Sequence, residues 1–128
     1  MNRFNRTRQD HRQELAEDYC ELIYQLVEAE KPPRAVDLAE TMGVTQVSAS
    51  KTLKRLRDAG YVMFEPYRCV ELTEKGVALA RASMRRHELV VGLLVRLGVP
   101  NDVAQTDAEG IEHHVSDATL DAISRFLG

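Results

Sequence analysis

Apolar residues recur every three or four positions along most of this chain, and that spacing is typical of helices with one buried side. The first such run spans residues 12–30 and ends before Pro32-Pro33, because proline cannot continue a helix. Its apolar positions are Leu15, Tyr19, Leu22, Ile23, Leu26 and Val27. Residues 1–11 alternate arginine with polar residues, and we expect them to form a flexible arm.

Two shorter helices are predicted next, over residues 34–42 and 45–59. Gly43 suits the end of the first helix, Thr45 suits the N-terminal cap of the second, and Gly60 suits its end. Two helices joined by a short glycine-containing turn form the helix-turn-helix pattern of DNA-binding proteins. The core-facing positions of the second helix are expected to be Val47, Leu53 and Leu56.

The second of these helices also carries the candidate contacts to DNA. Residues 45–57 contain four basic residues and no acid. Small polar side chains fill the first two turns, as the reading of base edges requires, whereas basic side chains further along suit phosphates. The base-reading candidates are Gln46, Ser48, Ser50 and Lys51, and the phosphate-binding candidates are Lys54, Arg55 and Arg57. The alternative, a pair of purely structural helices, leaves this polar front unexplained.

The composition changes to that of β-strands over residues 61–72. Two β-rich segments, residues 61–64 and 69–72, flank a turn at residues 65–68, which predicts a β-hairpin. Arg68 lies at the tip of this hairpin, where it could contact a phosphate. Added to the two helices, the hairpin makes a winged helix-turn-helix.

Four helical segments follow the hairpin. Thr73 caps the first, whose apolar positions run on toward His87. Residues 86–97 are apolar on most sides and should be buried in an interface, and Gly98-Val99-Pro100 ends them. Residues 109–114 form the next helix, and Ser116 caps the last one at residues 117–127.

The segment at residues 108–114 places two carboxylates and two imidazoles close together in the sequence. In a helix, Glu109, Glu112 and His113 fall at positions i, i+3 and i+4 and share one face. Carboxylate and imidazole ligands suit Mn²⁺, Fe²⁺, Co²⁺ or Zn²⁺, and the lack of thiolate argues against a structural zinc site. The alternative is an acidic helix face in water. Further candidate ligands at Asp18, Glu21 and His87 favour the metal site. His114 is interpreted either as a surface residue or as one that supports the ligands without binding the metal.

The 128 residues are enough for one compact domain or two small lobes with a real apolar core. The net charge of −3 is unevenly distributed: residues 1–12 hold four arginines and one acid, whereas residues 101–128 hold six acids and one arginine. Such a chain can offer a basic surface to DNA and keep an acidic end for a cation.

The sequence also indicates the cellular compartment of the protein. No apolar run reaches the length of a membrane span, and the first twelve residues lack the apolar core of a secretory signal, so we place the protein in the cytoplasm. Cys20 and Cys69 have no metal-binding spacing, and we expect both to be reduced thiols that serve in packing.

Four motifs follow one another along the chain: D-Y-C-E in the first helix, the winged helix, R-H-E-L, and D-A-E-G-I-E-H-H-V-S. In that order they resemble the manganese-responsive (MntR-like) branch of the diphtheria-toxin-repressor family of metalloregulators, from about residue 12 onward. The resemblance implies a binuclear metal site. Its ligands would be Asp18, Glu21, His87, Glu109, Glu112 and His113.

The resemblance also implies how these ligands are shared: Asp18 and His87 on one ion, His113 on the other, and the three glutamates near or bridging both. A set made of carboxylate and imidazole alone is hard, which favours Mn²⁺ over ions that prefer sulfur. Zn²⁺, Co²⁺ and Fe²⁺ remain able to take its place, because intrinsic affinity follows the Irving–Williams order.

The sequence therefore predicts a mainly α-helical protein. A winged helix-turn-helix domain with its arm at residues 1–72 is followed by a helical metal-binding and dimerisation domain at residues 73–128. The expected function is a Mn²⁺-activated repressor that binds palindromic, double-stranded operator DNA as a homodimer and controls manganese uptake genes, with no membrane or small organic substrate as partner.

Two other classes of protein could contain some of the same features. A metal-dependent hydrolase would use the same ligands, but no nucleophile or general base remains once they are assigned, so we expect no enzyme. A metal-independent winged-helix regulator is the stronger competitor. It predicts that replacing Glu109 or Glu112 leaves DNA binding intact.

Overall fold

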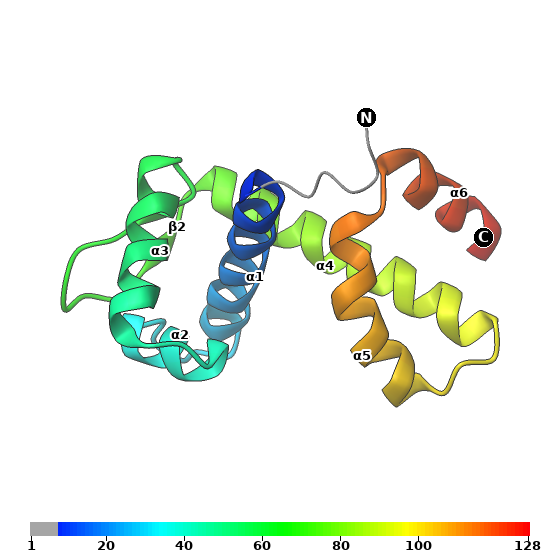
Figure 1. The fold of residues 1–128 in the computed structure, drawn as a ribbon, viewed down its shortest axis with the longest axis horizontal. Coiled ribbons are helices and arrows are strands. Elements are labelled where there is room, and N and C mark those ends of the chain that lie inside the picture. The colour runs from blue at the N-terminus through cyan, green and yellow to red at the C-terminus, as the bar shows by residue number, and fades with distance from the viewer. Residues whose placement is uncertain (1–7) are drawn as a thin grey trace. The chain divides into compact units, whose positions relative to one another are not determined.

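The computed structural model describes residues 8–128, which form two compact units that divide after Arg81. The first seven residues of the predicted arm lie outside the described residues. The elements in chain order are α1 (Arg8–Glu28), α2 (Ala35–Met42), α3 (Gln46–Asp58), β1 (Val62–Met63), β2 (Glu71–Leu72), α4 (Glu74–Arg96), α5 (Asn101–Ile111), the 3₁₀ helix η1 (Glu112–His114) and α6 (Asp117–Leu127) (Figure 1). The mainly helical fold class is thus confirmed, but α1 already includes residues 8–11, for which an arm was predicted.

The first unit is built around one apolar cluster to which α1, α2, α3 and the hairpin all contribute. Its buried members are Ala16, Tyr19, Ile23, Leu38, Leu53, Leu56, Val62, Phe64 and Val70. Two of the three predicted core positions of α3 belong to it, but Val47 is 67% exposed. Helical periodicity explains the error, because Val47 shares the outer face of α3 with Lys51 and Lys54, opposite Leu53 and Leu56.

The predicted turn between α2 and α3 is confirmed in detail. Gly43 adopts a left-handed backbone with φ 69°, and its N–H donates to the carbonyl oxygens of Ala39 and Glu40. The side chain of Thr45 accepts a hydrogen bond from the Ser48 backbone N–H at 3.1 Å, which caps α3. Both contacts satisfy backbone groups that a helix end leaves without partners, so the angle between the two helices is fixed locally.

The hairpin forms as predicted, but its ladder is short. β1 and β2 pair antiparallel, with Val62 opposite Leu72 and Met63 opposite Glu71. Its turn contains Tyr67, a non-glycine residue at φ 66°. Cys69 is exposed on the returning side, so the expectation that both cysteines serve in packing is wrong for Cys69 and right for the buried Cys20.

Helix α4 is continuous, whereas the sequence pattern predicted two helices with a boundary near Arg86. No proline or glycine signal interrupts the helix there, and the buried positions Ala80, Ser83 and Val90 continue one stripe across it. Its first turn is capped by Thr73, whose Oγ1 accepts the Gly76 N–H at 3.2 Å, as predicted.

Side chains at the start of α4 also donate hydrogen bonds to backbone carbonyls just after the end of α3. Thr73 Oγ1 donates to the Gly60 carbonyl at 2.6 Å, and Lys75 Nζ donates to the Ala59 carbonyl at 2.7 Å. Gly76 lies so close to the Tyr61 carbonyl oxygen that a β-carbon would collide with it. A larger residue at position 76 would therefore displace α4 from the hairpin.

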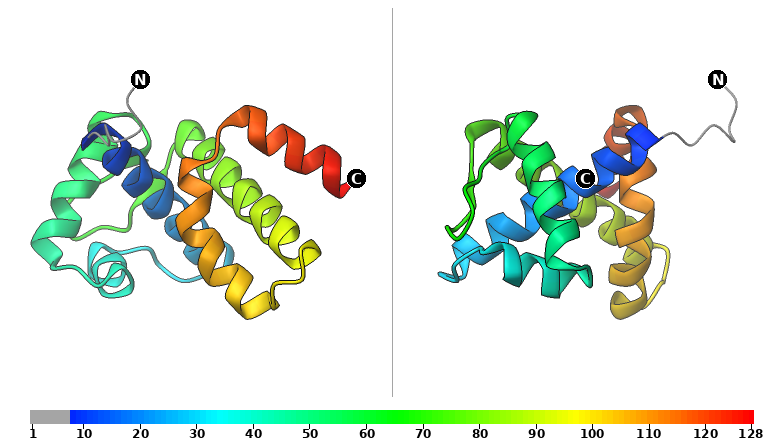
Figure 2. Two further views of the ribbon diagram at one scale, coloured as in Figure 1. Left: turned by 45° about the vertical axis from the view of Figure 1, so that its right-hand side comes forward. Right: turned by 60° about the vertical axis from the view of Figure 1, so that its left-hand side comes forward.

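The second unit consists of the C-terminal part of α4 with α5, η1 and α6, and Figure 2 shows α5 lying alongside α4 from two further directions. Val90, Ala104, Ala108, Leu120 and Ile123 are its buried apolar residues. The helix predicted at residues 109–114 is instead the end of α5 followed by η1. None of the helices among residues 8–128 combines the length and apolar character needed to cross a membrane.

Candidate metal centre and nucleic-acid interface

His87 on α4 is the centre of a polar cluster in the second unit. Its Nδ1 lies 2.7 Å from Glu112 Oε2 and 3.4 Å from Glu109 Oε1. Its Nε2 lies 2.7 Å from Gln105 Oε1. Because Gln105 and Glu109 are one turn apart on α5, they face the same side, and the turn into η1 brings Glu112 to the same ring.

Glu112 is the most deeply buried member, with a side chain only 1% exposed. Its Oε2 is paired with His87, but its Oε1 has no hydrogen-bond partner within the described part of the chain. His113 Nε2 lies 3.8 Å from this Oε1. Leaving a buried carboxylate oxygen unpaired is costly, and a bound cation would supply the missing partner.

The pKa values of Glu112 and His87 in this cluster are both raised. Burial raises the pKa of Glu112 to about 7, although the hydrogen bond from His87 opposes the shift. For His87, burial lowers the pKa, but hydrogen bonds with Gln105 and Glu112 and the negative charges of Glu112 and Glu109 outweigh it, so its pKa is raised overall. The His87–Glu112 pair therefore holds a proton near neutral pH, which a metal ion would displace.

The donor atoms fit a divalent metal ion. One ligand atom from each of His87, Glu109 and Glu112 lies within 4.8 Å of the others. Two carboxylates and one imidazole form the oxygen and nitrogen set that suits Mn²⁺ and similar ions. Glu109 is 61% exposed and opens the cluster to solvent, so an ion can enter from that side.

The structure places the other predicted ligands in different surroundings. His113 lies in η1 next to Glu112, with its side chain only 6% exposed. Asp18 and Glu21 lie on α1 in the first unit, where both are half-buried. His114 is exposed, as interpreted from the sequence. Gln105 was missed by the sequence analysis, although its spacing of four from Glu109 would have placed it on the same helix face.

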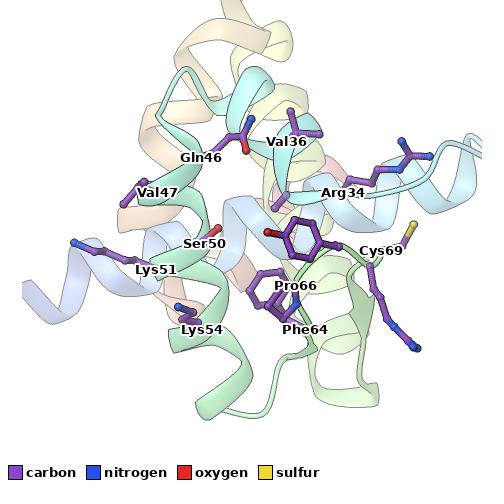
Figure 3. A pocket seen from close by; sticks show the side chains of 13 residues that line it. Arg34, Val36, Gln46, Val47, Ser50, Lys51, Lys54, Phe64, Pro66 and Cys69 are labelled. Atoms are coloured by element: carbon purple, nitrogen blue, oxygen red, sulfur yellow. The ribbon is translucent and has the colours of Figure 1, made fainter.

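The first unit carries a groove of about 900 Å³ between the start of α2, the outer face of α3 and the hairpin (Figure 3). Five of the predicted DNA contacts line it, namely Gln46, Ser50, Lys51, Lys54 and Arg68. Arg34 and Tyr67 line it too and were missed, because they come from a helix start and a turn rather than from α3. The groove thus joins small polar and basic side chains on one open face.

A second hollow on the first unit is lined by further predicted DNA contacts. Ser48 and Arg55 line it together with His11 and Arg12 from α1. Arg57 Nε lies 3.4 Å from Asp58 Oδ1 at the exposed end of α3. Seven of the eight predicted DNA contacts therefore line two adjoining hollows, which share Lys51.

Two family models match the chain, one on each side of the hairpin's end. The first, described as the iron dependent repressor, N-terminal DNA binding domain, matches residues 13–70. The second, described as the iron dependent repressor, metal binding and dimerisation domain, matches residues 73–128. The positions of the groove and of the carboxylate–histidine cluster agree with these two descriptions.

Individual relatives support the same family. The transcriptional regulator MntR of Salmonella typhimurium is 46% identical over 123 residues, which cover 96% of this chain and 78% of that protein. The HTH-type transcriptional regulator MntR of Bacillus subtilis is 38% identical over 107 residues, covering 84% of this chain and 75% of that protein. These relatives are transcriptional regulators, in line with the expectation that this chain is no enzyme.

Solved structures add the fold. A manganese-dependent transcriptional repressor in complex with manganese is 35% identical, with a TM-score of 0.81, over 88% of this chain and 52% of that one. The manganese regulator SloR is 33% identical, with a TM-score of 0.75, over 88% and 53%. The chain thus spans about half the length of these structures. On this combined sequence and structural likeness, the chain belongs to the iron-dependent repressor family of metalloregulators, also called the diphtheria-toxin-repressor family, and to its MntR-like branch.

Proposed function

We propose that this chain is a Mn²⁺-activated transcriptional repressor that binds palindromic operator DNA as a homodimer and controls manganese uptake genes. The observation that carries the proposal is the buried Glu112 carboxylate, which contacts His87 with one oxygen and leaves the other without a hydrogen-bond partner among the described residues. Two similar solved structures, a manganese-dependent transcriptional repressor and the manganese regulator SloR, support the choice of manganese. We also propose that it acts in the cytoplasm, because a transcriptional repressor must reach its operator DNA.

The proposed metal ligands begin with His87, Glu109 and Glu112. A bound divalent ion would supply positive charge that offsets the repulsion between the two carboxylates and satisfies the buried Glu112 oxygen. His113 follows Glu112 directly, and the family resemblance adds Asp18 and Glu21 as ligands that complete a binuclear site. We propose Mn²⁺ as the resident ion, with Zn²⁺, Co²⁺ and Fe²⁺ as substitutes, because all six ligands are hard or borderline.

Residues 1–72 are proposed to bind the DNA, with α3 as the recognition helix. Gln46, Ser48, Ser50 and Lys51 come early in α3 and would reach base edges in the major groove. The phosphate contacts would be Lys54, Arg55, Arg57 and Arg68, to which the structure adds Arg34 as a groove-lining cation. The exposed ring of Tyr67 in the hairpin turn would lie against the sugar-phosphate backbone.

Residues 73–128 are proposed to dimerise as well as bind metal. Several large apolar side chains of the second unit are exposed in the single chain, namely Val95, Leu97, Val103, Ile111 and Phe126. A two-fold symmetric dimer would cover such residues and would present two recognition helices to the two halves of a palindrome. The description of the matched family model as a dimerisation domain supports this assignment.

The experiment that tests this function is a titration of fluorescence anisotropy. An operator is first recovered from random-sequence duplexes by selection with the protein and Mn²⁺, and then labelled. We expect Mn²⁺ to tighten operator binding by about 5–150-fold, the usual range of allosteric coupling. Equal affinity with Mn²⁺ and with a chelator would identify a metal-independent winged-helix regulator and overturn the proposal.

A further inference from the structure

The two ring nitrogens of His87 have different partners on opposite sides. Nδ1 faces the carboxylates of Glu112 and Glu109 at 2.7 and 3.4 Å. Nε2 faces Gln105 Oε1 at 2.7 Å. A histidine that binds a metal through one nitrogen keeps a proton on the other, and that proton needs an acceptor. The amide oxygen of Gln105 can serve only as an acceptor and stands where this proton would be.

Gln105 is also placed to hold the ring without competing for the ion. The lone pairs of the two imidazole nitrogens diverge, so a group that contacts Nε2 lies outside the cluster formed around Nδ1. The side chain of His87 is 18% exposed, and contacts on both ring nitrogens fix the orientation of the ring. Because the amide carries no charge, it directs the ring without adding a third negative group to the cluster of His87, Glu109 and Glu112.

We propose that Gln105 is a positioning residue of the metal centre: by accepting the Nε2–H of His87, it makes Nδ1 the atom that binds the metal. This inference rests on the proposed function of the same site. Its consequence is that a residue which does not touch the ion sets both the affinity for Mn²⁺ and the identity of the donor nitrogen. Loss of such an outer partner usually lowers metal affinity by about 10–100-fold.

Three variants test the role of the acceptor. Gln105→Leu keeps the approximate size but removes the acceptor, and we expect Mn²⁺ to bind about 10–100-fold more weakly. Gln105→Glu restores an acceptor oxygen and should recover most of that affinity. Thr106→Val is the matched control on the same exposed turn of α5, where the hydroxyl bonds only to the Asp102 carbonyl at 3.2 Å, and it should bind Mn²⁺ as the parent does.

A double-substitution cycle separates positioning from a general effect on the fold. In a His87→Ala background, Gln105→Leu should cause no further loss of Mn²⁺ affinity, because the group it acts through is gone. Equal losses with and without His87 would show that Gln105 supports the fold rather than the ring, and would overturn the inference.

Nitrogen NMR of His87 in the Zn²⁺-loaded protein gives a readout that does not depend on DNA binding. We expect the zinc on Nδ1 and a slowly exchanging proton on Nε2 in the parent, and faster exchange of that proton in Gln105→Leu. Zinc on Nε2 of the parent, or unchanged Mn²⁺ affinity in Gln105→Leu, would overturn the inference and leave the repressor function standing. Failure of the parent to bind Mn²⁺ at all would overturn both.

Discussion

The metal centre and the DNA-binding face are built on opposite physical principles. The centre uses few groups, and its key carboxylate, Glu112, is 1% exposed, so this carboxylate meets a low effective dielectric and has no substitute. The DNA-binding face spreads several cations and small polar groups over exposed positions of α2, α3 and the hairpin. A buried site of this kind should fail when one member is lost, whereas the exposed face should weaken in steps.

Salt should reveal the same contrast. Charges exposed to solvent are screened within about 8–10 Å at physiological ionic strength, and contacts to phosphates are weakened further by counterion competition. Buried groups are screened much less. Raising the salt concentration should therefore weaken operator binding far more than it weakens Mn²⁺ binding.

The largest expected effect comes from breaking the buried site with Glu112→Gln. The amide cannot supply a second anionic ligand, so we expect the Mn²⁺-dependent gain in operator affinity, typically about 1–3 kcal/mol, to disappear. The metal-free protein should keep or gain stability, because the buried side chain no longer carries a negative charge. Anisotropy and thermal unfolding with and without Mn²⁺ measure both effects.

Glu88→Gln is the matched control for that experiment. Glu88 directly follows His87 on α4, is exposed and stands outside the cluster, so its loss removes one negative charge near the site without removing a ligand. It should retain the full response to Mn²⁺. A full response in Glu112→Gln as well would mean that the metal acts elsewhere.

On the DNA-binding face, the largest single effect is expected from Gln46→Ala. Gln46 lies in the first turn of α3 and lines the groove, where an amide can bond to a base edge. We expect a loss of about 1–3 kcal/mol of discrimination at one base pair of each half-site. Competition between operators that differ at single positions measures this loss. Equal weakening on operator and random DNA would assign Gln46 to the phosphates instead.

Comparison of these two regions also shows what the sequence could predict. Local signals were sufficient for the fold: Gly43 and Thr45 fixed the turn, and apolar periodicity located the core. They failed at Val47, because an apolar residue on a DNA-reading face looks like a core residue. They also failed near Arg86, where a change in composition predicts a helix boundary but α4 is continuous.

The candidate site was predictable to a similar degree and for similar reasons. The spacing of Glu109 and Glu112 indicated a shared face, and both lie at the His87 ring. Arg34 carried no such signal, and Gln105 carried only its spacing of four from Glu109. A single arginine or amide is common on any surface, and only tertiary packing gives it a partner. The roles of Asp18 and Glu21 as ligands remain predictions from the family resemblance.

The raised pKa values at the buried site make the stability of the metal-free protein depend on pH. The folded-state pKa of Glu112 is raised to about 7 from 4.5, and that of His87 is raised above 6.5. The folded metal-free protein therefore holds protons that the unfolded chain releases. The stability from Glu112 is complete below pH 4.5 and is lost as pH rises through about 7, and that from His87 is lost as pH rises above 6.5.

Metal binding must displace those protons, so its pH dependence has the opposite sign. We expect Mn²⁺ affinity to rise by up to about tenfold per pH unit between roughly pH 6 and 8. Calorimetric titration at several pH values, in buffers of different ionisation enthalpy, measures the affinity and the protons released. An affinity that does not change over this range would show that the His87–Glu112 pair is not a ligand to the ion.

The smallest effect is expected from Lys54→Ala on the exposed face. Lys54 lies beyond the base-reading turns of α3, lines the groove and is exposed, so it is placed to contact a phosphate. We expect operator and random DNA to weaken alike by under about 1 kcal/mol, and the slope of log affinity against log salt to fall by about 1. Lys31→Ala removes an exposed lysine outside the groove and is the control, for which the slope should not change. Should Lys54→Ala alter the preference among operators while leaving the slope intact, Lys54 would be a base-reading residue, and the division of α3 into a reading part and a phosphate-binding part would have to move by one turn.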